Sequence, residues 1–443
     1  MTETVDERRA ADTGCPDCGT ALTGGGAYVA WCAGCGWNTD PGATEEAPPA
    51  GRIDRVRRRL AHRYGEQLFA DLTASGGPGE PGPSDESGEK ASRAGRGRSG
   101  WLATCLALAV HGLTLALLGG GIAMIAAGQG LVPVLGALPL LVALVLRPRL
   151  GSLRKTAAHL PVLRRADAPE LFGLLDDVAA AVGTTGVEAV VVDADVNASV
   201  RTYGIRRQRV LTVGLGLWET LSPQERVVLL GHEFGHYAHG DTRHALVVST
   251  AFQSLDTWSY TLAPQPSESL LDDLTNLATA LPRMAVDGVA GLLDHLTLRG
   301  AQRAEYLADE AAARTGGSRA AAALMDRLLS ADAVAGMLRR EAVAARTRRT
   351  GARSEDAAEG LWQRLAAQAG AVPASEYERL RRVAELRGHS VDSTHPPTHL
   401  RHRLLAAGAF APRIVLDAER AARVDAELGD ARRTLARELL LRG

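Results

Sequence analysis

The longest charge-free stretch of the sequence limits the fold more than any other feature. From Trp101 to Leu146, 46 residues contain no Asp, Glu, Lys or Arg. A helix that crosses a lipid bilayer needs about 20 apolar residues, so this run predicts two membrane-spanning helices with a turn near the sequence AGQGLVP. Pro133 and Pro139 make the second helix the weaker prediction, and a buried hairpin in a soluble protein is the alternative.

Basic residues flank this run on both sides. They are Lys90, Arg93, Arg96 and Arg98 before it, and Arg147, Arg149, Arg154 and Lys155 after it. Positive residues near the ends of membrane-spanning helices favour the cytoplasmic side, so both flanks are expected there. Over the whole chain of 443 residues the charges balance to a net −1, and this near-neutral total does not favour nucleic acid as a partner.

Four cysteines near the N-terminus form two closely spaced pairs. The sequences CPDC and CAGC contain Cys15, Cys18, Cys32 and Cys35. Two such pairs joined by a short hairpin are typical of a tetrahedral zinc site, in which the metal replaces a core that the segment is too small to form. We therefore predict a zinc ribbon over residues 1–50, with disulfides as the alternative. The pattern does not indicate what the ribbon binds.

The next two segments differ sharply in composition. Residues 51–73 place apolar side chains at helical spacing opposite an arginine-rich face, which predicts a basic amphipathic helix. Such a helix binds anionic lipid or an acidic partner, or it packs on the ribbon with its charges in solvent. Residues 74–100 are almost devoid of apolar residues and are expected to be a disordered linker.

Beyond the apolar run, residues 151–443 have the pattern of a globular domain. Residues 187–193 and 209–217 are apolar and β-branched and predict strands, whereas most of residues 301–443 is alanine-rich and arginine-rich and predicts helices. The apolar run near residues 244–255 is too short for a third membrane-spanning helix.

The sequence LSPQERVVLLGHEFGHYAHGD contains three of the chain's twelve histidines. Ser222 and Glu225 have the spacing of a capping box, Pro223 fits the first helical position, and Gly240 is expected to end the helix. His232 and His236 would then lie on one face of that helix, where both can bind one zinc ion.

Glu233 is placed beside the first histidine to act on a zinc-bound water rather than on the metal. His239 lies seven residues from His232, about 10 Å along the helix axis, which is too far for both to bind one zinc. A catalytic zinc needs a third protein ligand. Glu305 is a candidate, and Asp309 could orient a histidine, although an acidic pair at this spacing is more often a solvated helix face.

Three motifs in the same order, HEFGH, RAEYLAD and STHPPTHLR, resemble those of the M48 family of integral-membrane metallopeptidases. The resemblance covers roughly residues 153–407. It implies an α+β fold, a mainly helical gluzincin-type metallopeptidase domain with a small β-sheet, here preceded by the transmembrane hairpin and the zinc ribbon. It also implies a catalytic zinc held by His232, His236 and Glu305.

The same resemblance assigns roles to other residues. Glu233 would be the general base, His395 would stabilise the oxyanion, and Asp309 and Arg401 would support the zinc ligands. Asn197 and Ala198 match the strand edge along which members of the family bind substrate. The ribbon and the basic helix are additions to the family's pattern, and its usual second pair of hydrophobic segments is faint in this chain.

These observations predict a zinc-dependent endopeptidase of the bacterial inner membrane with two zinc ions, one catalytic and one structural. The ribbon and the catalytic domain would face the cytoplasm, and the expected partners are a protein or peptide substrate, membrane lipid and an unidentified partner of the ribbon. The alternative is a membrane adaptor that has lost catalysis and recruits partners through its ribbon and basic helix. Nucleic-acid binding by the ribbon is a further alternative, which predicts strongly salt-dependent binding.

Overall fold

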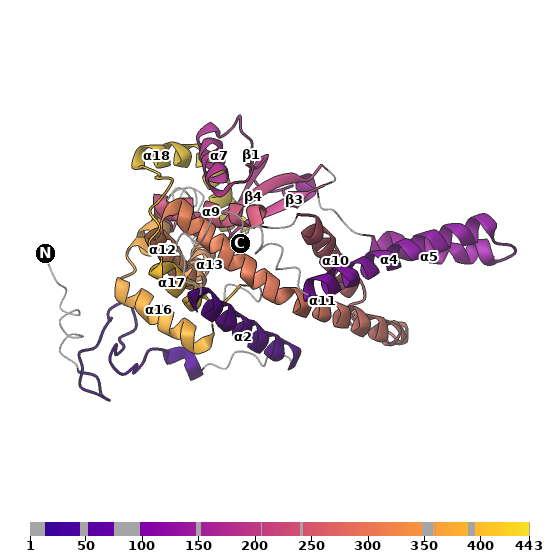
Figure 1. Cartoon of the computed structure of the whole chain (residues 1–443), viewed down its shortest axis with the longest axis horizontal. Coiled ribbons are helices and arrows are strands. Elements are labelled where there is room, and N and C mark those ends of the chain that lie inside the picture. Colours follow the sequence, from indigo (N-terminus) through magenta and orange to yellow (C-terminus); the bar gives the residue numbers. More distant parts are fainter. Residues whose placement is uncertain are drawn as a thin grey trace. The chain divides into compact units, whose positions relative to one another are not determined.

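The computed structural model divides into two compact units (Figure 1). The first comprises Met1–Glu80, Leu153–Ala238 and Gln302–Gly443, and the second comprises Pro81–Ser152 and His239–Ala301. The structure describes residues 14–44, 52–74, 98–147, 152–204, 206–239, 242–347, 358, 360–388 and 395–442. The predicted division of the sequence into residues 1–50, 51–73, 74–100, 101–146 and 151–443 stays a prediction.

The first unit contains a four-stranded sheet in the order β1-β2-β4-β3. Its strands are β1 (Val162–Leu163), β2 (Ala189–Asp193), β3 (Ala198–Tyr203) and β4 (Gln208–Gly214). Strands β2 and β4 are parallel and the other two pairs are antiparallel. Strand β2 is a nearly continuous run of apolar residues because its side chains are buried. Strand β3 lies at one edge of this sheet.

The second predicted strand is shorter than expected. Strand β4 ends at Gly214, and the chain continues as helix α8 (Leu215–Trp218) instead of extending the strand to residue 217. A short apolar run that is fully buried has the same composition in a strand and in a helix, so composition did not locate this boundary.

Helices make up most of the first unit and confirm the predicted class, a mainly helical fold with a small sheet. They include α7 (Pro169–Val182), α9 (Pro223–His239), α12 (Ser318–Leu329), α13 (Ala331–Thr347), α15 (Leu361–Gly370), α16 (Ala374–Arg387), α17 (Thr398–Ala407), α18 (Ala418–Glu427) and α19 (Gly429–Arg442). The main core lies between α7, the sheet, α9 and the C-terminal helices, with Phe172, Trp218 and Phe234 fully buried.

The cysteines of the ribbon lie together at the N-terminal end of this unit. All four are free, and one potential ligand atom from each lies within 4.8 Å of the others. The Sγ atoms of Cys15 and Cys35 are 3.5 Å apart, and those of Cys18 and Cys32 are 3.6 Å apart. Sulfur atoms about 2.3 Å from one tetrahedral zinc would be separated by about 3.8 Å. The cluster therefore has the spacing of a zinc site.

The ribbon contacts helix α16 of its own chain. Arg382 places its guanidinium 4.8 Å from the centre of the Trp31 ring and donates to the carbonyl of Ala33 at 2.7 Å. Arg387 forms two hydrogen bonds with the carboxylate of Asp40, at 2.5 and 2.6 Å. One surface of the predicted ribbon is thus covered within the chain itself.

The second unit is helical in its described residues. It contains α4 (Arg98–Ala127), α5 (Val132–Leu146), α10 (Thr242–Thr261) and residues 270–301 of α11 (Leu270–Gly316). Ala107, Leu255 and Leu293 are among its buried core residues. Within the described residues one helix, Ser99–Ala127, is long and apolar enough to cross a membrane, and Val132–Leu146 is a shorter apolar helix of 15 residues.

Two polar groups of helix α4 have different surroundings. The Nε2 atom of His111 lies 3.1 Å from both the Val247 carbonyl and the Thr250 hydroxyl, so this histidine joins α4 to α10. Cys105 is a free cysteine on the exposed face of the same helix.

Candidate metal centre

Helix α9 contains the paired histidines and begins as the sequence predicts. The Ser222 backbone N–H donates to the Glu225 carboxylate at 2.7 Å, and the Glu225 N–H lies 3.3 Å from the Ser222 hydroxyl. These two contacts form a capping box that satisfies donors at the first turn. The helix extends to His239, and Gly240, the predicted stop, lies outside the described residues.

Two glycines allow α9 to pass close to helix α11. A Cβ atom on Gly235 would lie 2.8 Å from the Cα of Ala308, and one on Gly231 would lie 3.1 Å from the Cα of Ala312. Any larger residue at position 235 would push the two helices apart. The close crossing brings the histidines of α9 to the acidic residues of α11. These glycines have a structural role that the sequence analysis did not identify.

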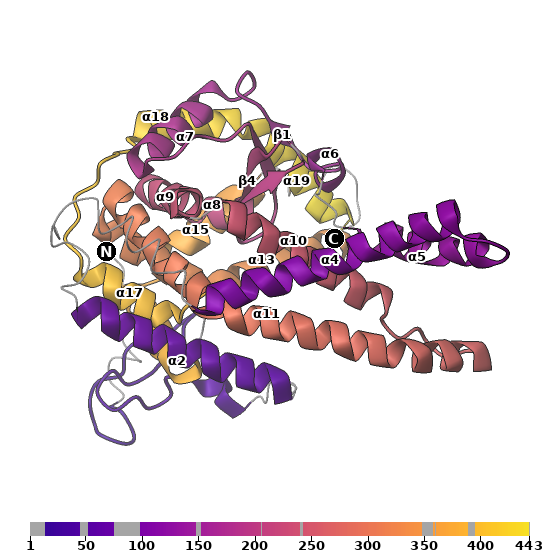
Figure 2. The ribbon, with the colours of Figure 1, turned by 45° about the vertical axis from the view of Figure 1, so that its right-hand side comes forward.

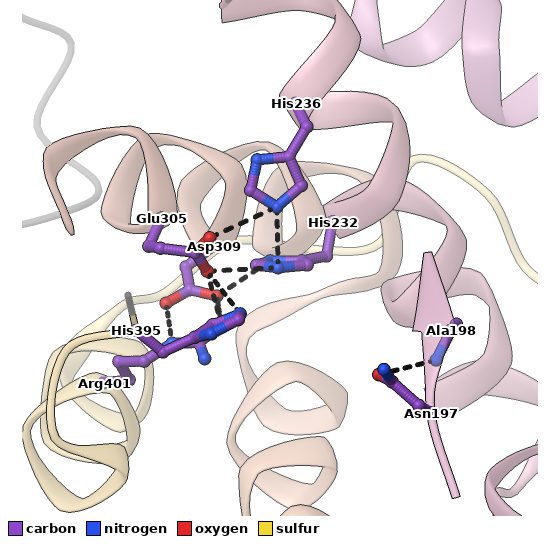
Figure 3. A network of polar contacts seen from close by, with 8 residues as sticks. All are labelled: Asn197, Ala198, His232, His236, Glu305, Asp309, His395 and Arg401. Atoms are coloured by element: carbon purple, nitrogen blue, oxygen red, sulfur yellow. Dashed lines mark hydrogen bonds and ion pairs between the residues drawn. The ribbon is translucent and has the colours of Figure 1, made fainter. Parts of the chain in front are cut away.

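His232, His236 and Glu305 converge on one point in the crossing (Figure 3). The two Nε2 atoms are 3.2 Å apart. Each lies 3.5 Å from an oxygen of Glu305, Oε2 for His232 and Oε1 for His236. Atoms about 2.1 Å from a common tetrahedral ion would lie about 3.4 Å apart. The spacing and the nitrogen and oxygen donors therefore fit a zinc ion.

The ionisation of this cluster is strongly perturbed. Burial disfavours the charged form of His232, but the neighbouring Asp309 and Glu305 outweigh it and raise the pKa of His232 to about 10. Burial and the charge on His232 lower the pKa of His236 to about 4. Although burial opposes it, the surrounding cations lower the pKa of Glu305 to about 2. A metal ion would have to displace the proton from His232.

Asp309 and Arg401 form a buried ion pair behind His232. Arg401 donates from Nε and Nη2 to the two oxygens of Asp309 at 2.7 and 2.6 Å, and both residues are only 1% exposed. Asp309 Oδ1 lies 3.1 Å from Nδ1 of His232. A carboxylate at this distance favours a proton on Nδ1, and Nε2 is the nitrogen that faces His236 and Glu305. Arg401 also keeps the pKa of Asp309 well below its usual range despite burial.

His395 joins the same cluster from the segment before α17. Its Nε2 lies 3.1 Å from Oε2 of Glu305. His232, Glu305 and His395 thus form a second set of three ligand atoms close enough for one ion. Two overlapping sets of ligands are present, and they differ in whether His236 or His395 is the third member.

Glu233 lies beside the cluster and is 7% exposed. Burial raises its pKa to about 7, while the positive field of His232 acts in the opposite direction. A hydrogen bond with the backbone of Val200 on β3 also stabilises the carboxylate. A carboxyl with a pKa near neutrality can both accept and return a proton.

The two residues expected to bind substrate lie at the start of strand β3: Ala198 is its first residue and Asn197 directly precedes it. The Asn197 side-chain oxygen accepts a hydrogen bond from the Ala198 N–H at 2.9 Å, and Figure 3 shows this pair at the start of the strand, without a drawn contact to the histidine cluster. Tyr237 of α9 donates to the Arg201 carbonyl at 2.9 Å and so links this helix to β3. Tyr237 and Val200 were not identified from the sequence.

Comparisons with known proteins agree with these features. The model of peptidase family M48 matches residues 166–408, which is more than half of the chain and includes both histidine motifs and Glu305. Neither a curated protein nor a solved structure matches the chain. The resemblance seen in the three sequence motifs is confirmed, and the chain belongs to peptidase family M48, a family of metal-dependent peptidases.

Proposed function

We propose that this chain is a zinc-dependent endopeptidase anchored in a membrane. The observation that supports it best is the convergence of His232, His236 and Glu305 at 3.2 to 3.5 Å, with Glu233 beside them. Three protein ligands leave a fourth position of a tetrahedral ion open, as a catalytic zinc site requires. Quality control of membrane proteins is the role that we propose for this activity.

We assign the zinc ligands to His232, His236 and Glu305 rather than to the set that includes His395. The three distances among the first set are all close to the tetrahedral value. His232 and His236 also come from successive turns of one rigid helix, whereas His395 lies on a loop. This leaves His395 beside the metal, where its ring can donate a hydrogen bond to a substrate oxygen.

The residues have distinct tasks in peptide hydrolysis. A bound zinc supplies Lewis acidity and makes water acidic enough to be a nucleophile near pH 7. Glu233 accepts the proton from the attacking water and returns it to the departing amine. His395 donates to the oxygen of the scissile carbonyl as negative charge develops there. Asp309 and Arg401 hold His232 in the tautomer that binds metal.

Substrate is proposed to lie along the edge of β3 as an extended peptide. Strand β3 is an edge strand of the sheet, and it pairs with β4 on its other side. The backbone of an added strand would hydrogen-bond to this edge independently of its side chains. Because Glu233 is linked to Val200 of the same strand, a peptide bound there would be placed beside the general base.

Removal of the metal is the first test of this function. We expect purified full-length protein to cleave an unfolded protein such as casein, to lose that activity after chelation, and to recover it when zinc is added back, because the ligands are inactive without the ion. Cleavage is measured from the appearance of peptides by mass spectrometry. Cleavage that persists unchanged after chelation, with metal analysis showing no zinc, would overturn the proposal of a zinc-dependent enzyme. A zinc-loaded protein that cleaves nothing would overturn it in favour of the adaptor hypothesis.

Membrane anchoring is proposed from the second unit. Helix α4 leaves large apolar side chains exposed, among them Leu108, Leu113 and Leu115, each at least 50% exposed. Residues 270–284 of α11 continue this pattern, with Leu270, Leu274, Leu277 and Leu281 more than 60% exposed. Lipid is the environment in which such surfaces are stable. The basic flanks support a cytoplasmic position for both ends of the proposed hairpin.

Extraction of cell membranes tests the anchor. We expect the full-length chain to stay in the membrane pellet after alkaline carbonate treatment, because α4 is long enough to cross the bilayer. A variant without residues 98–147 is the matched control and is expected in the supernatant. Release of the full-length chain into the supernatant would contradict the proposed membrane insertion.

A further inference from the structure

Helix α2 (Arg52–Ala74) contacts the residues that directly follow Glu305 and His395 in the sequence. The carbonyl of Gly65 accepts a hydrogen bond from the hydroxyl of Tyr306, which directly follows Glu305, at 3.3 Å. At the same position, a Cβ atom would lie 2.6 Å from Cδ of Pro397 and 3.7 Å from Cβ of Pro396, the residue that directly follows His395. One glycine therefore touches both segments.

Other residues of the helix extend this contact, and Figure 2 shows α2 beside α17. The Gln302 side chain, which is fully buried, donates to the Ala61 carbonyl at 2.9 Å. Leu68 forms a buried cluster with Tyr306 of α11 and Leu404 of α17. Helix α2 is thus packed against both α11 and α17. It is not a free helix surrounded by solvent.

Gly65 lies in the middle of α2, where glycine is unfavourable. Glycine within a helix is less stable than alanine by about 0.5–1 kcal/mol. The Tyr306 bond uses the backbone, so it does not require glycine. The close approach of Pro397 does require glycine at this position. A Cβ atom on residue 65 would lie 2.6 Å from Cδ of Pro397, so either the helix or the proline would have to move.

We propose that Gly65 is a positioning residue that keeps Glu305 and His395 in their mutual geometry, and that helix α2 thereby controls catalysis from outside the metal centre. Glu305 and His395 come from different elements, and their side chains lie 3.1 Å apart. Helix α2 bridges the two elements directly beside these residues. The inference rests on the proposed peptidase function, because it concerns the rate of that reaction.

The substitution Gly65→Ala tests this proposal in the full-length chain. Helix propensity alone predicts a slightly more stable α2, whereas the added methyl group is expected to displace the Pro396–Pro397 segment and with it His395. We expect kcat to fall by at least about tenfold with KM unchanged, since small misplacements of reacting groups have effects of this size. Steady-state kinetics with a quenched peptide measures both constants.

A matched control and a compensating change separate positioning from general damage. Gly300 lies in helix α11 with nothing within 4 Å of an added Cβ, so Gly300→Ala changes helix propensity alone and is expected to keep the parent kcat. Replacing Pro397 with alanine removes the atoms at 2.6 and 3.6 Å. Gly65→Ala is therefore expected to lower kcat much less when it is introduced into the Pro397→Ala variant than when it is introduced into the parent chain.

Hydrogen exchange of metal-free protein gives a readout that does not depend on activity. We expect faster exchange at residues 395–407 in Gly65→Ala and parent-like exchange in the double variant. Parent-like kcat and exchange in Gly65→Ala would overturn the inference, and so would a kcat loss that the second change does not reduce. If wild type and Glu233→Gln cleave equally slowly, the proposed function fails instead, and the exchange experiment still decides whether Gly65 positions the segment.

Discussion

Replacing Glu233 with glutamine is expected to lower kcat by about 10²- to 10⁴-fold, the usual contribution of a general acid–base group. Glutamine is nearly isosteric with the carboxylate but cannot accept the proton from water. Because Glu233 is not among the proposed ligands, the variant should keep its catalytic zinc. The measurement is cleavage of a quenched peptide by metal-loaded protein, with zinc content determined on the same samples.

Glu310→Gln is the matched control for this change. Glu310 is also a glutamate of the catalytic region, but it lies on the outer face of α11 and pairs with Arg314 at 2.6 Å in a partly exposed ion pair. Loss of such a pair changes stability by at most about 1 kcal/mol. We expect parent-like kcat in this variant. Equal activity of Glu233→Gln and wild type, with equal zinc content, would exclude the general-base assignment.

Replacing Asp309 with alanine is expected to lower the free energy of unfolding by about 3–5 kcal/mol, because the change leaves the guanidinium of Arg401 buried without its partner. It should also weaken zinc binding at the catalytic site by about 10- to 100-fold, since His232 loses the group that fixes its tautomer. Thermal unfolding of metal-free protein measures the first effect, and competition with a chelator measures the second.

Two further variants separate these effects. Asp430 and Arg433 form an exposed pair, so Asp430→Ala is a matched control that should leave both quantities nearly unchanged. The double variant Asp309→Leu with Arg401→Met removes both buried charges and is expected to recover much of the lost stability without recovering zinc affinity. Full zinc affinity in the double variant would contradict the assignment of Asp309 as the group that orients His232.

The sequence predicted those parts of the site that depend on local spacing. His232 and His236 are one helical turn apart, and so are Glu305 and Asp309, so each pair lies on one helix face wherever its helix is placed. Spacing alone could not show that the acidic pair faces inward. The family resemblance supplied that information, and the structure brings the four side chains together.

Contacts between distant segments were not predictable in the same way. Arg401 is almost fully buried although arginine is usually exposed, and its ion pairs with Asp309 and Glu305, both distant in the chain, explain this. The close crossing of α9 and α11 depends on Gly235 facing Ala308, which no local pattern reveals. The docking of α2 beside Tyr306 was also missed, because its arginine-rich face suggested solvent or lipid.

An anomalous difference map at the zinc absorption edge, from crystals of the zinc-loaded full-length protein, tests the central claim most directly. We predict a peak about 2.1 Å from Nε2 of His232, Nε2 of His236 and one oxygen of Glu305, with the ring of His395 outside bonding distance. A peak bound by His232, Glu305 and His395 with His236 turned away, or no peak between α9 and α11, would contradict the account.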